Sequence, residues 1–312
     1  MKRGLVSWDK INELPPEEFA ARLAAVHAVA REKGVDAVVV YSDVWRSNDA
    51  RYLSNFMPYW NRAFVVVTPD ENPILLCALS PRVYPWIKTV TMHETIIASS
   101  SPPATLFKLC AERGWTRVGV CDLDGLPEDL HAELTAGALE LVDISRSEIR
   151  PAPVESEVRM HARAARMARE VLEQELASGG AKTDHELTGR LERVLRRAGA
   201  EDVVVLVSDG EGPPIPAEGR PVGPHTSVVV ANEYNGHWAK VTRNFAGVTS
   251  GFDPRDGVTQ LREILSGPYS WESIADTKAD AVVSLQLQIP ANGRQYYYGD
   301  TCLQSREGLR VL

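Results

Sequence analysis

The pattern of the sequence changes at RPAPVESE, residues 150–157, and this change restricts the fold more than any other feature. Before it, short apolar runs alternate with amphipathic segments. After it come two amphipathic segments and then a series of β-type runs. Alternating strands and helices are typical of an α/β domain, whereas helices followed by antiparallel strands are typical of an α+β domain. We therefore expect an α/β domain over residues 1–150 and an α+β domain over residues 151–312.

The expected elements of the first domain have clear boundaries. Prolines and acidic residues open a helix at residue 16, and Gly34 closes it. The apolar run RAFVVVTPDENPILLCAL predicts two strands around a turn. Further strands are expected in DAVVVYS, TIIASS, RVGVCD and LELVDIS, with helices in PATLFKLCAERG and PEDLHAELTAG. This order predicts a mixed sheet with helices packed against it.

The second domain begins with a long amphipathic helix over residues 154–178. A capping box at residues 183–186 then opens a second helix. Two β-type runs meet at Asn235-Gly236, a dipeptide that favours a tight hairpin turn. We expect a short helix in DGVTQLREILSG, residues 256–267, and a final strand pair in DAVVSLQLQIP and YYYGDTCLQS.

Composition excludes some classes of partner. The net charge is −8, and the chain has no long basic run, so we expect no nucleic-acid partner. No apolar run is long enough for a membrane span or a signal peptide, and we expect no membrane partner. The four cysteines lack CxxC spacing, which indicates buried thiols in a reducing cytoplasm.

Four segments follow one another along the chain: NDARYLSNFMPYWNRAFVVV, RPAPVESEVRMHARAARMA, GHWAKVTRNFAG and YYYGDTCLQSREGLRVL. Together they resemble the creatinase, prolidase and aminopeptidase P superfamily. The resemblance implies an N-terminal α/β domain and a C-terminal α+β domain of the "pita-bread" type. It also implies a strand and turn at YLSNF. The C-terminal domain is expected to be shortened, because only about 35 residues separate Phe245 from the run DAVVSLQLQ.

The metal-dependent members of this superfamily hold two divalent ions with two aspartates, a histidine and two glutamates. The resemblance places the aspartates at Val229 and Lys240 and the glutamates at Gln286 and Gly299, and the histidine segment has no counterpart. A lysine ammonium group repels cations, and neither valine nor glycine offers a side-chain ligand. We therefore expect no metal, and nothing in the sequence predicts another cofactor.

Two interpretations of Lys240 remain open. Its ammonium group could take over the electrostatic role of the lost cation. Alternatively, it could form an ordinary ion pair with Glu233 or Asp300 across the sheet.

Creatinase itself shows that this fold can cleave a carbon–nitrogen bond without metal, with a histidine as general acid and base. The loop that carries this histidine has only His225 here, which we expect to be exposed. His237 and Lys240 remain as candidate catalytic residues, although their spacing on a regular strand would point them to opposite faces. The candidate substrate-binding residues are Trp60, Arg62, Glu233, Gln286, Gln288, Tyr298 and Asp300.

In dimeric relatives, the N-terminal domain of one subunit contributes an aromatic residue and an arginine to the pocket of the other. This implies such a role for Trp60 and for Arg62, which could bind a carboxylate with two hydrogen bonds. The alternative for Arg62 is an interface salt bridge.

Two functional hypotheses follow. The first is a metal-independent hydrolase or lyase that acts on a C–N bond of a small amino-acid-like or amide-like molecule. The second is a non-catalytic pita-bread protein, either a binding module or a regulatory subunit of an active paralogue. For both we expect a small-molecule ligand, a homodimer or a heterodimer with a paralogue, and a cytoplasmic location.

Overall fold

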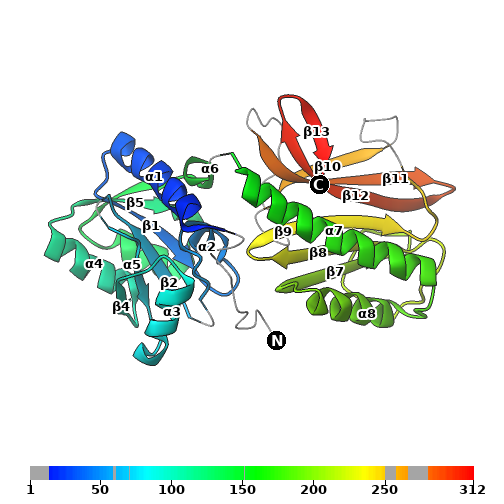
Figure 1. The fold of residues 1–312 in the computed structure, drawn as a ribbon, viewed down its shortest axis with the longest axis horizontal. Coiled ribbons are helices and arrows are strands. Elements are labelled where there is room, and N and C mark those ends of the chain that lie inside the picture. Colours follow the sequence, from blue (N-terminus) through cyan, green and yellow to red (C-terminus); the bar gives the residue numbers. More distant parts are fainter. Residues whose placement is uncertain (1–13, 59–60, 70, 151, 250–257, 266–279) are drawn as a thin grey trace. The chain divides into compact units, whose positions relative to one another are not determined.

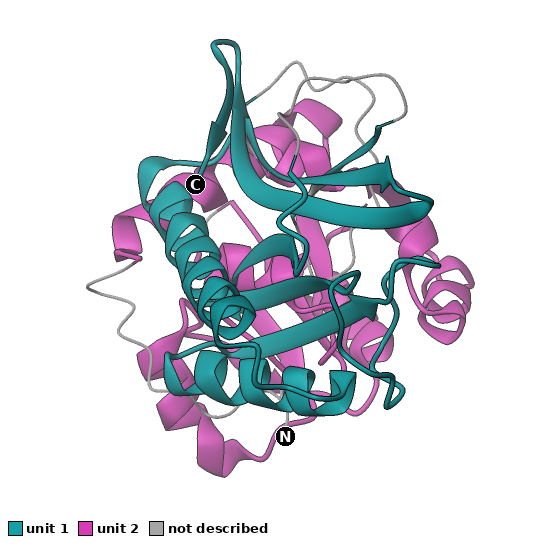
Figure 2. Ribbon diagram, turned by 90° about the vertical axis from the view of Figure 1, so that its right-hand side faces the viewer, with its two compact units in different colours: residues 1–6, 152–312 teal, residues 7–151 magenta. Residues whose placement is uncertain are grey.

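The computed structural model describes residues 14–58, 61–69, 71–150, 152–249, 258–265 and 280–312. The chain forms two compact units, which among the described residues are 14–150 and 152–312 (Figures 1 and 2). Each unit is built around its own sheet.

The N-terminal unit contains a six-stranded mixed sheet in the order β4-β3-β2-β1-β5-β6. Its strands are β1 (Ala37–Ser42), β2 (Ala63–Val67), β3 (Ile74–Cys77), β4 (Ile96–Ala98), β5 (Arg117–Cys121) and β6 (Glu140–Ile144). β2 is antiparallel to β1 and β3, and the other pairs are parallel. The four central strands are buried along almost their whole length, so their sequences are continuously apolar rather than alternating.

Helices cover both faces of this sheet. They are α1 (Pro16–Lys33), α2 (Asn48–Ser54), α3 (Tyr84–Val90), α4 (Pro102–Arg113), α5 (Glu128–Thr135) and α6 (Arg146–Ile149), with short 3₁₀ turns at Pro81–Val83 and Leu123–Gly125. α1, α2, α3 and α6 contribute to one apolar core, which includes Leu23, Leu53 and Ile149. α4 and α5 contribute Leu106 and Leu134 to the core on the other face. The unit is therefore a three-layer α/β domain.

The C-terminal unit contains a seven-stranded sheet with the main order β10-β11-β12-β9-β8-β7, and β13 pairs with β12. The strands are β7 (Asp202–Ser208), β8 (Ser227–Tyr234), β9 (His237–Asn244), β10 (Thr259–Ile264), β11 (Ala281–Ala291), β12 (Arg294–Ser305) and β13 (Gly308–Val311). All of these pairs are antiparallel. Asn235 and Gly236 both have positive φ, as the predicted tight hairpin between β8 and β9 requires.

Two helices, α7 (Glu155–Ser178) and α8 (Asp184–Arg197), pack against this sheet (Figure 1). Val228, Val230 and Val241 point toward them and share a core with Leu172 of α7 and Leu187 of α8, among others. We call this side of the sheet the helix face. Side chains alternate along a strand, so Val229, Lys240 and Thr242 point to the other side, which we call the opposite face.

Two local predictions are wrong. Residues of the segment expected to be a strand and turn instead form helix α2, which Asn55 ends in a left-handed conformation. The predicted helix around residues 256–267 is strand β10 in its described part, where Thr259–Ile264 pairs with β11. A short isolated helix is only marginally stable, and here the edge of the long strand β11 provides backbone hydrogen bonds instead.

Candidate functional site

The positions predicted to replace the metal ligands lie in one row across the sheet. Val229 on β8 is opposite Thr242 on β9, Thr242 is opposite Gly299 on β12, and Gly299 is opposite Gln286 on β11. Lys240 lies two residues along β9 and therefore on the same face. The four positions that the resemblance assigns to the metal ligands therefore share the opposite face of the sheet.

The side chain of Gln286 fills the middle of this row. Thr242 donates a hydrogen bond through Oγ1 to Oε1 of Gln286, and Nε2 of Gln286 donates to Oγ of Ser284 at 2.8 Å. A Cβ atom at Gly299 would lie 2.3 Å from Oε1 of Gln286 and 2.6 Å from the carbonyl oxygen of Leu285. Gly299 is therefore the residue that leaves room for the Gln286 carboxamide.

Lys240 forms an ion pair with Glu263 on β10, with Nζ donating to Oε2 at 2.7 Å. Both side chains are largely buried, with exposed fractions of 12% and 14%. The Thr301 hydroxyl accepts a hydrogen bond from the Lys240 amide at 2.9 Å. The ion-pair interpretation of Lys240 therefore holds, but its partner is neither Glu233 nor Asp300. Glu263 was missed because its segment was expected to be helical.

These residues do not fit a pair of divalent ions. Val229 and Gly299 have no ligand atoms, and the ammonium group of Lys240 is already bound to the acid that faces it. Within the described residues, no group of three or more histidine, cysteine, aspartate or glutamate side chains is arranged to hold a metal ion. Hard divalent cations need several anionic oxygen ligands, and the Lys240 ammonium would repel them.

His237 points to the helix face, away from Lys240. Its Nδ1 lies 2.8 Å from the carbonyl oxygen of Asn235, and its Nε2 lies 3.8 Å from Oε1 of Glu157 on α7. Its ring meets that of His161 edge to face, with centroids 5.0 Å apart. The structure does not bring His237 and Lys240 together, because residues three apart on a regular strand face opposite sides. A paired catalytic role for the two is excluded by this geometry.

Asp300 and Tyr298 also lie on the helix face. Asp300 is 3% exposed at its side chain and accepts hydrogen bonds from Arg169 of α7 at 2.8 Å and from Arg243 of β9 at 3.0 Å. The Arg243 guanidinium stacks over the Tyr298 ring, 4.7 Å from its centroid. These contacts fasten α7 to the sheet, so Asp300 and Tyr298 do not share a site with Gln286.

Two other candidates in this unit, Glu233 and Gln288, lie on the opposite face. Glu233 is next to Trp238 across the β8–β9 pair, and both are fully buried. Gln288 lies two residues beyond Gln286 on β11 and pairs with Tyr297. His225, expected to be exposed, is instead half-buried, and its Nδ1 lies 2.7 Å from the hydroxyl of Tyr296. Lys240, Gln286, Gln288 and Glu233 are therefore the predicted site residues that share a face.

Arg62 lies in the N-terminal unit, just before β2. It forms an ion pair with Asp129 of α5, within its own unit. Trp60 lies outside the described residues. The structure thus shows an internal partner for Arg62, where the sequence suggested either a ligand carboxylate or an interface salt bridge.

Comparison with known proteins identifies the type of the N-terminal domain and the fold of the chain. Residues 22–160 match the Creatinase/Prolidase N-terminal domain. The chain is similar in structure to the Xaa-Pro dipeptidase of Bacillus anthracis, with a TM-score of 0.70, 16% identity and coverage of 94% of this chain and 97% of the other. It is also similar to the X-Pro aminopeptidase of Thermotoga maritima, with a TM-score of 0.71, 14% identity and coverage of 93% and 96%. No curated protein matches the chain in sequence.

The predicted resemblance is therefore confirmed. The N-terminal domain is of the creatinase/prolidase type, and the C-terminal unit has the pita-bread fold of the prolidase structures in a shortened form. At identities this low, the structural similarity establishes the fold and leaves the chemistry to be argued from the residues.

A glutamate at position 299 tests whether Gln286 fills the space next to this glycine. We expect Gly299→Glu to lower the free energy of unfolding by about 1–3 kcal/mol, because the new side chain must displace Gln286 from a packed position. Gly212→Glu is the matched control, since a Cβ atom there meets nothing within 4 Å. Urea unfolding measures both variants, and an equal effect would contradict the packing argument.

Proposed function

We propose that this chain is a metal-independent, non-catalytic member of the creatinase and prolidase superfamily that serves as a binding or regulatory protein. The observation that carries the proposal is the self-contained polar network on the opposite face. Lys240 is bound to Glu263, and Gln286 is bound to Thr242 and Ser284, at positions that the resemblance assigns to the metal ligands. These polar groups could bind a substrate only after their present hydrogen bonds or ion pairs break, and breaking such contacts in a buried site costs free energy.

The separation of the candidate catalytic residues supports the same conclusion. A general base requires a partner that orients it and a substrate within hydrogen-bonding reach. His237 lies beneath α7 with an exposed fraction of 8%, so it offers no side chain to the opposite face. Lys240 already donates through Nζ to the Glu263 carboxylate at 2.7 Å, so its ammonium group is engaged within the protein.

The second candidate function is a metal-independent hydrolase or lyase that acts on a small amino-acid-like or amide-like molecule. One observation favours it. Lys240, Glu263 and Gln286 supply an ammonium, a carboxylate and a carboxamide on the same face of the sheet. Such a set could bind an amide and exchange a proton with it if the ion pair opens.

Metal analysis and activity assays together distinguish these functions. We expect the purified full chain to contain no stoichiometric manganese, zinc or iron, and to hydrolyse neither X-Pro dipeptides nor a panel of amides and ureas, with or without added Mn²⁺. Turnover that survives a chelating agent and is lost in Lys240→Met protein that circular dichroism shows to be folded, but not in His237→Asn, would establish the second candidate. Stoichiometric metal or Mn²⁺-stimulated turnover would contradict both.

The partner and the location are also proposals. We propose a dimer, either of two copies or with a longer paralogue, because the superfamily resemblance implies it. Sedimentation of the pure chain at micromolar concentration tests the homodimer, and co-purification of a homologous chain tests the heterodimer.

We propose a cytoplasmic location because all four cysteines are free and buried. No helix in the described part of the chain has the length and apolar character needed to cross a bilayer.

A further inference from the structure

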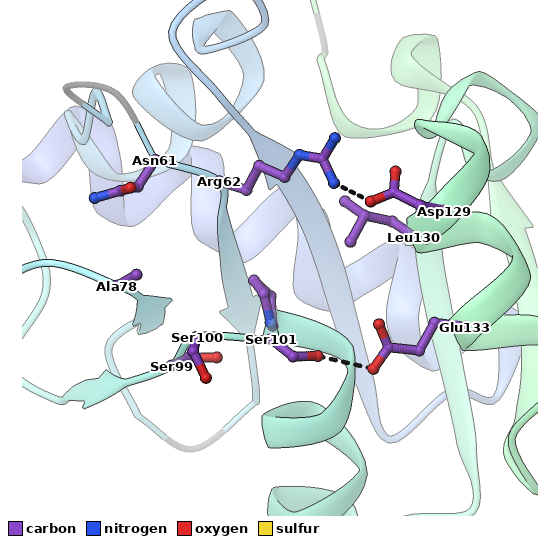
Figure 3. Close-up of a pocket in the computed structure, with 10 residues that line it drawn as sticks. Asn61, Arg62, Ala78, Ser99, Ser100, Ser101, Asp129, Leu130 and Glu133 are labelled. Atoms are coloured by element: carbon purple, nitrogen blue, oxygen red, sulfur yellow. Dashed lines mark hydrogen bonds and ion pairs between the residues drawn. The ribbon is translucent and has the colours of Figure 1, made fainter.

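The N-terminal unit contains a pocket of about 390 Å³ at one end of the strands of its sheet (Figure 3). It lies beyond the carboxyl ends of β3 and β4, where α/β domains commonly bind ligands. Arg62 reaches the same end because β2 runs antiparallel to its neighbours. The residues that line it are Asn61, Arg62, Ala78, Ser99, Ser100, Ser101, Pro102, Asp129, Leu130 and Glu133. The lining is therefore mostly polar and comes from several elements that are far apart in sequence.

Three charged side chains define the electrostatics of this pocket. Asp129 and Glu133 are one turn apart on α5, and Arg62, just before β2, points toward Asp129 (Figure 3). Arg62 pairs with Asp129 and lowers the pKa of that carboxyl below its ordinary value. Glu133 accepts a hydrogen bond from the Ser101 hydroxyl at 2.8 Å. The lining thus contains two carboxylates and one guanidinium, which together favour a ligand with a positive group.

The start of helix α4 does not reverse this preference. A helix N-terminus binds anions through its unpaired amide groups. Here the first two positions are Pro102 and Pro103, which have no amide hydrogen, and the amide of Ala104 donates to the side chain of Ser101 at 3.2 Å. An anion alone would therefore find its main donor in Arg62, beside two carboxylates.

The Arg62 guanidinium nevertheless keeps hydrogen-bond donors that its bond to Asp129 does not use. Its bond to Asp129 uses Nη1, and a guanidinium carries five N–H donors in a rigid planar arrangement. A ligand carboxylate could bind to the remaining donors without breaking the ion pair. The hydroxyl groups of Ser99, Ser100 and Ser101 and the amide of Asn61 supply further polar contacts around the pocket.

We propose that this pocket binds a small amino-acid zwitterion, with its ammonium group against Asp129 and Glu133 and its carboxylate on Arg62. The pocket is large enough to admit a ligand of this size. The site is separate from the polar network of the C-terminal unit, so it would give the chain a ligand whether or not the proposed lack of catalysis holds.

Three related probes test the charge requirement on the full chain. They are L-serine, ethanolamine, which lacks its carboxylate, and 3-hydroxypropanoate, which lacks its amine. We expect L-serine to bind most tightly, with a Kd of about 1 mM, and each truncated probe to bind roughly tenfold more weakly. Saturation-transfer NMR titrations measure the three affinities. Equal binding of all three probes, or no binding of L-serine, would overturn the proposal.

Matched variants then place the ligand in this pocket. Glu133→Gln and Arg62→Gln should each weaken L-serine binding roughly tenfold, because each removes one charge-assisted hydrogen bond. Glu128→Gln makes the same change in charge at an exposed residue of α5 that does not line the pocket, and it should leave the affinity unchanged. An equal loss in Glu128→Gln and Glu133→Gln would show that only the general charge of the helix matters, and would overturn the assignment. The unsubstituted chain and the three variants should unfold at similar urea concentrations, because the three substituted side chains are exposed.

Discussion

Replacing Lys240 by methionine should lower the free energy of unfolding by about 3–5 kcal/mol, because the substitution leaves the Glu263 carboxylate buried without its counter-charge. Urea-induced unfolding followed by far-UV circular dichroism measures the change. The effect should be this large because both side chains are mostly removed from water, where an isolated charge loses its solvation. If Lys240 instead faced an open, water-filled active site, its removal would cost little.

Two further variants make this prediction specific. Lys33→Met breaks an ion pair with Glu148 that has the same 2.7 Å separation but is about one-third exposed, so the loss there should be far smaller. The double variant Lys240→Met/Glu263→Leu removes both charges and should recover most of the lost stability, because an apolar pair can replace a buried ion pair. A double variant no more stable than Lys240→Met would contradict the proposed pairing.

Replacing Asp300 by alanine should have a comparably large effect, again about 3–5 kcal/mol of unfolding free energy. The carboxylate lies between the guanidinium groups of Arg169 and Arg243, and its side chain is only 3% exposed. Its loss leaves two cations facing each other between α7 and the sheet. The same unfolding measurement applies.

Glu173→Gln is the matched control for Asp300→Ala. Glu173 also pairs with Arg243, at 3.7 Å, but its side chain is 56% exposed. We therefore expect a change of less than about 1 kcal/mol. If Asp300→Ala left stability intact but abolished binding of a small molecule, the residue would be a ligand contact, as the sequence suggested, and the structural role assigned to it would be wrong.

The order of elements could largely be predicted from the sequence. Continuous apolar runs such as 37–42 and 63–67 have the composition of strands buried on both faces, and proline and glycine mark the ends of α1. The hairpin at Asn235-Gly236 follows from the need for two residues with positive φ. These features depend on residues that are close together in the sequence, so they can be predicted without knowledge of the tertiary structure.

The partners of the site residues could not be predicted in the same way. Lys240 and Glu263 are 23 residues apart, and they meet because β10 pairs with β11 at the sheet edge. Whether residues 259–264 form a helix or a strand depends on that edge, since a short segment has only weak preferences of its own. Because this segment was expected to be a helix, Glu263 could not be identified from the sequence as the partner of Lys240.

The sequence by itself determined which chemical groups stand at the positions that the resemblance assigns to the metal ligands: valine, lysine, glutamine and glycine. Strand alternation also determined that His237 and Lys240 face opposite sides. Only the tertiary structure decided what those groups do, because hydrogen bonds and ion pairs form between strands whose register is set by the whole sheet. That register brings Gln286 over Gly299 and Glu263 to Lys240.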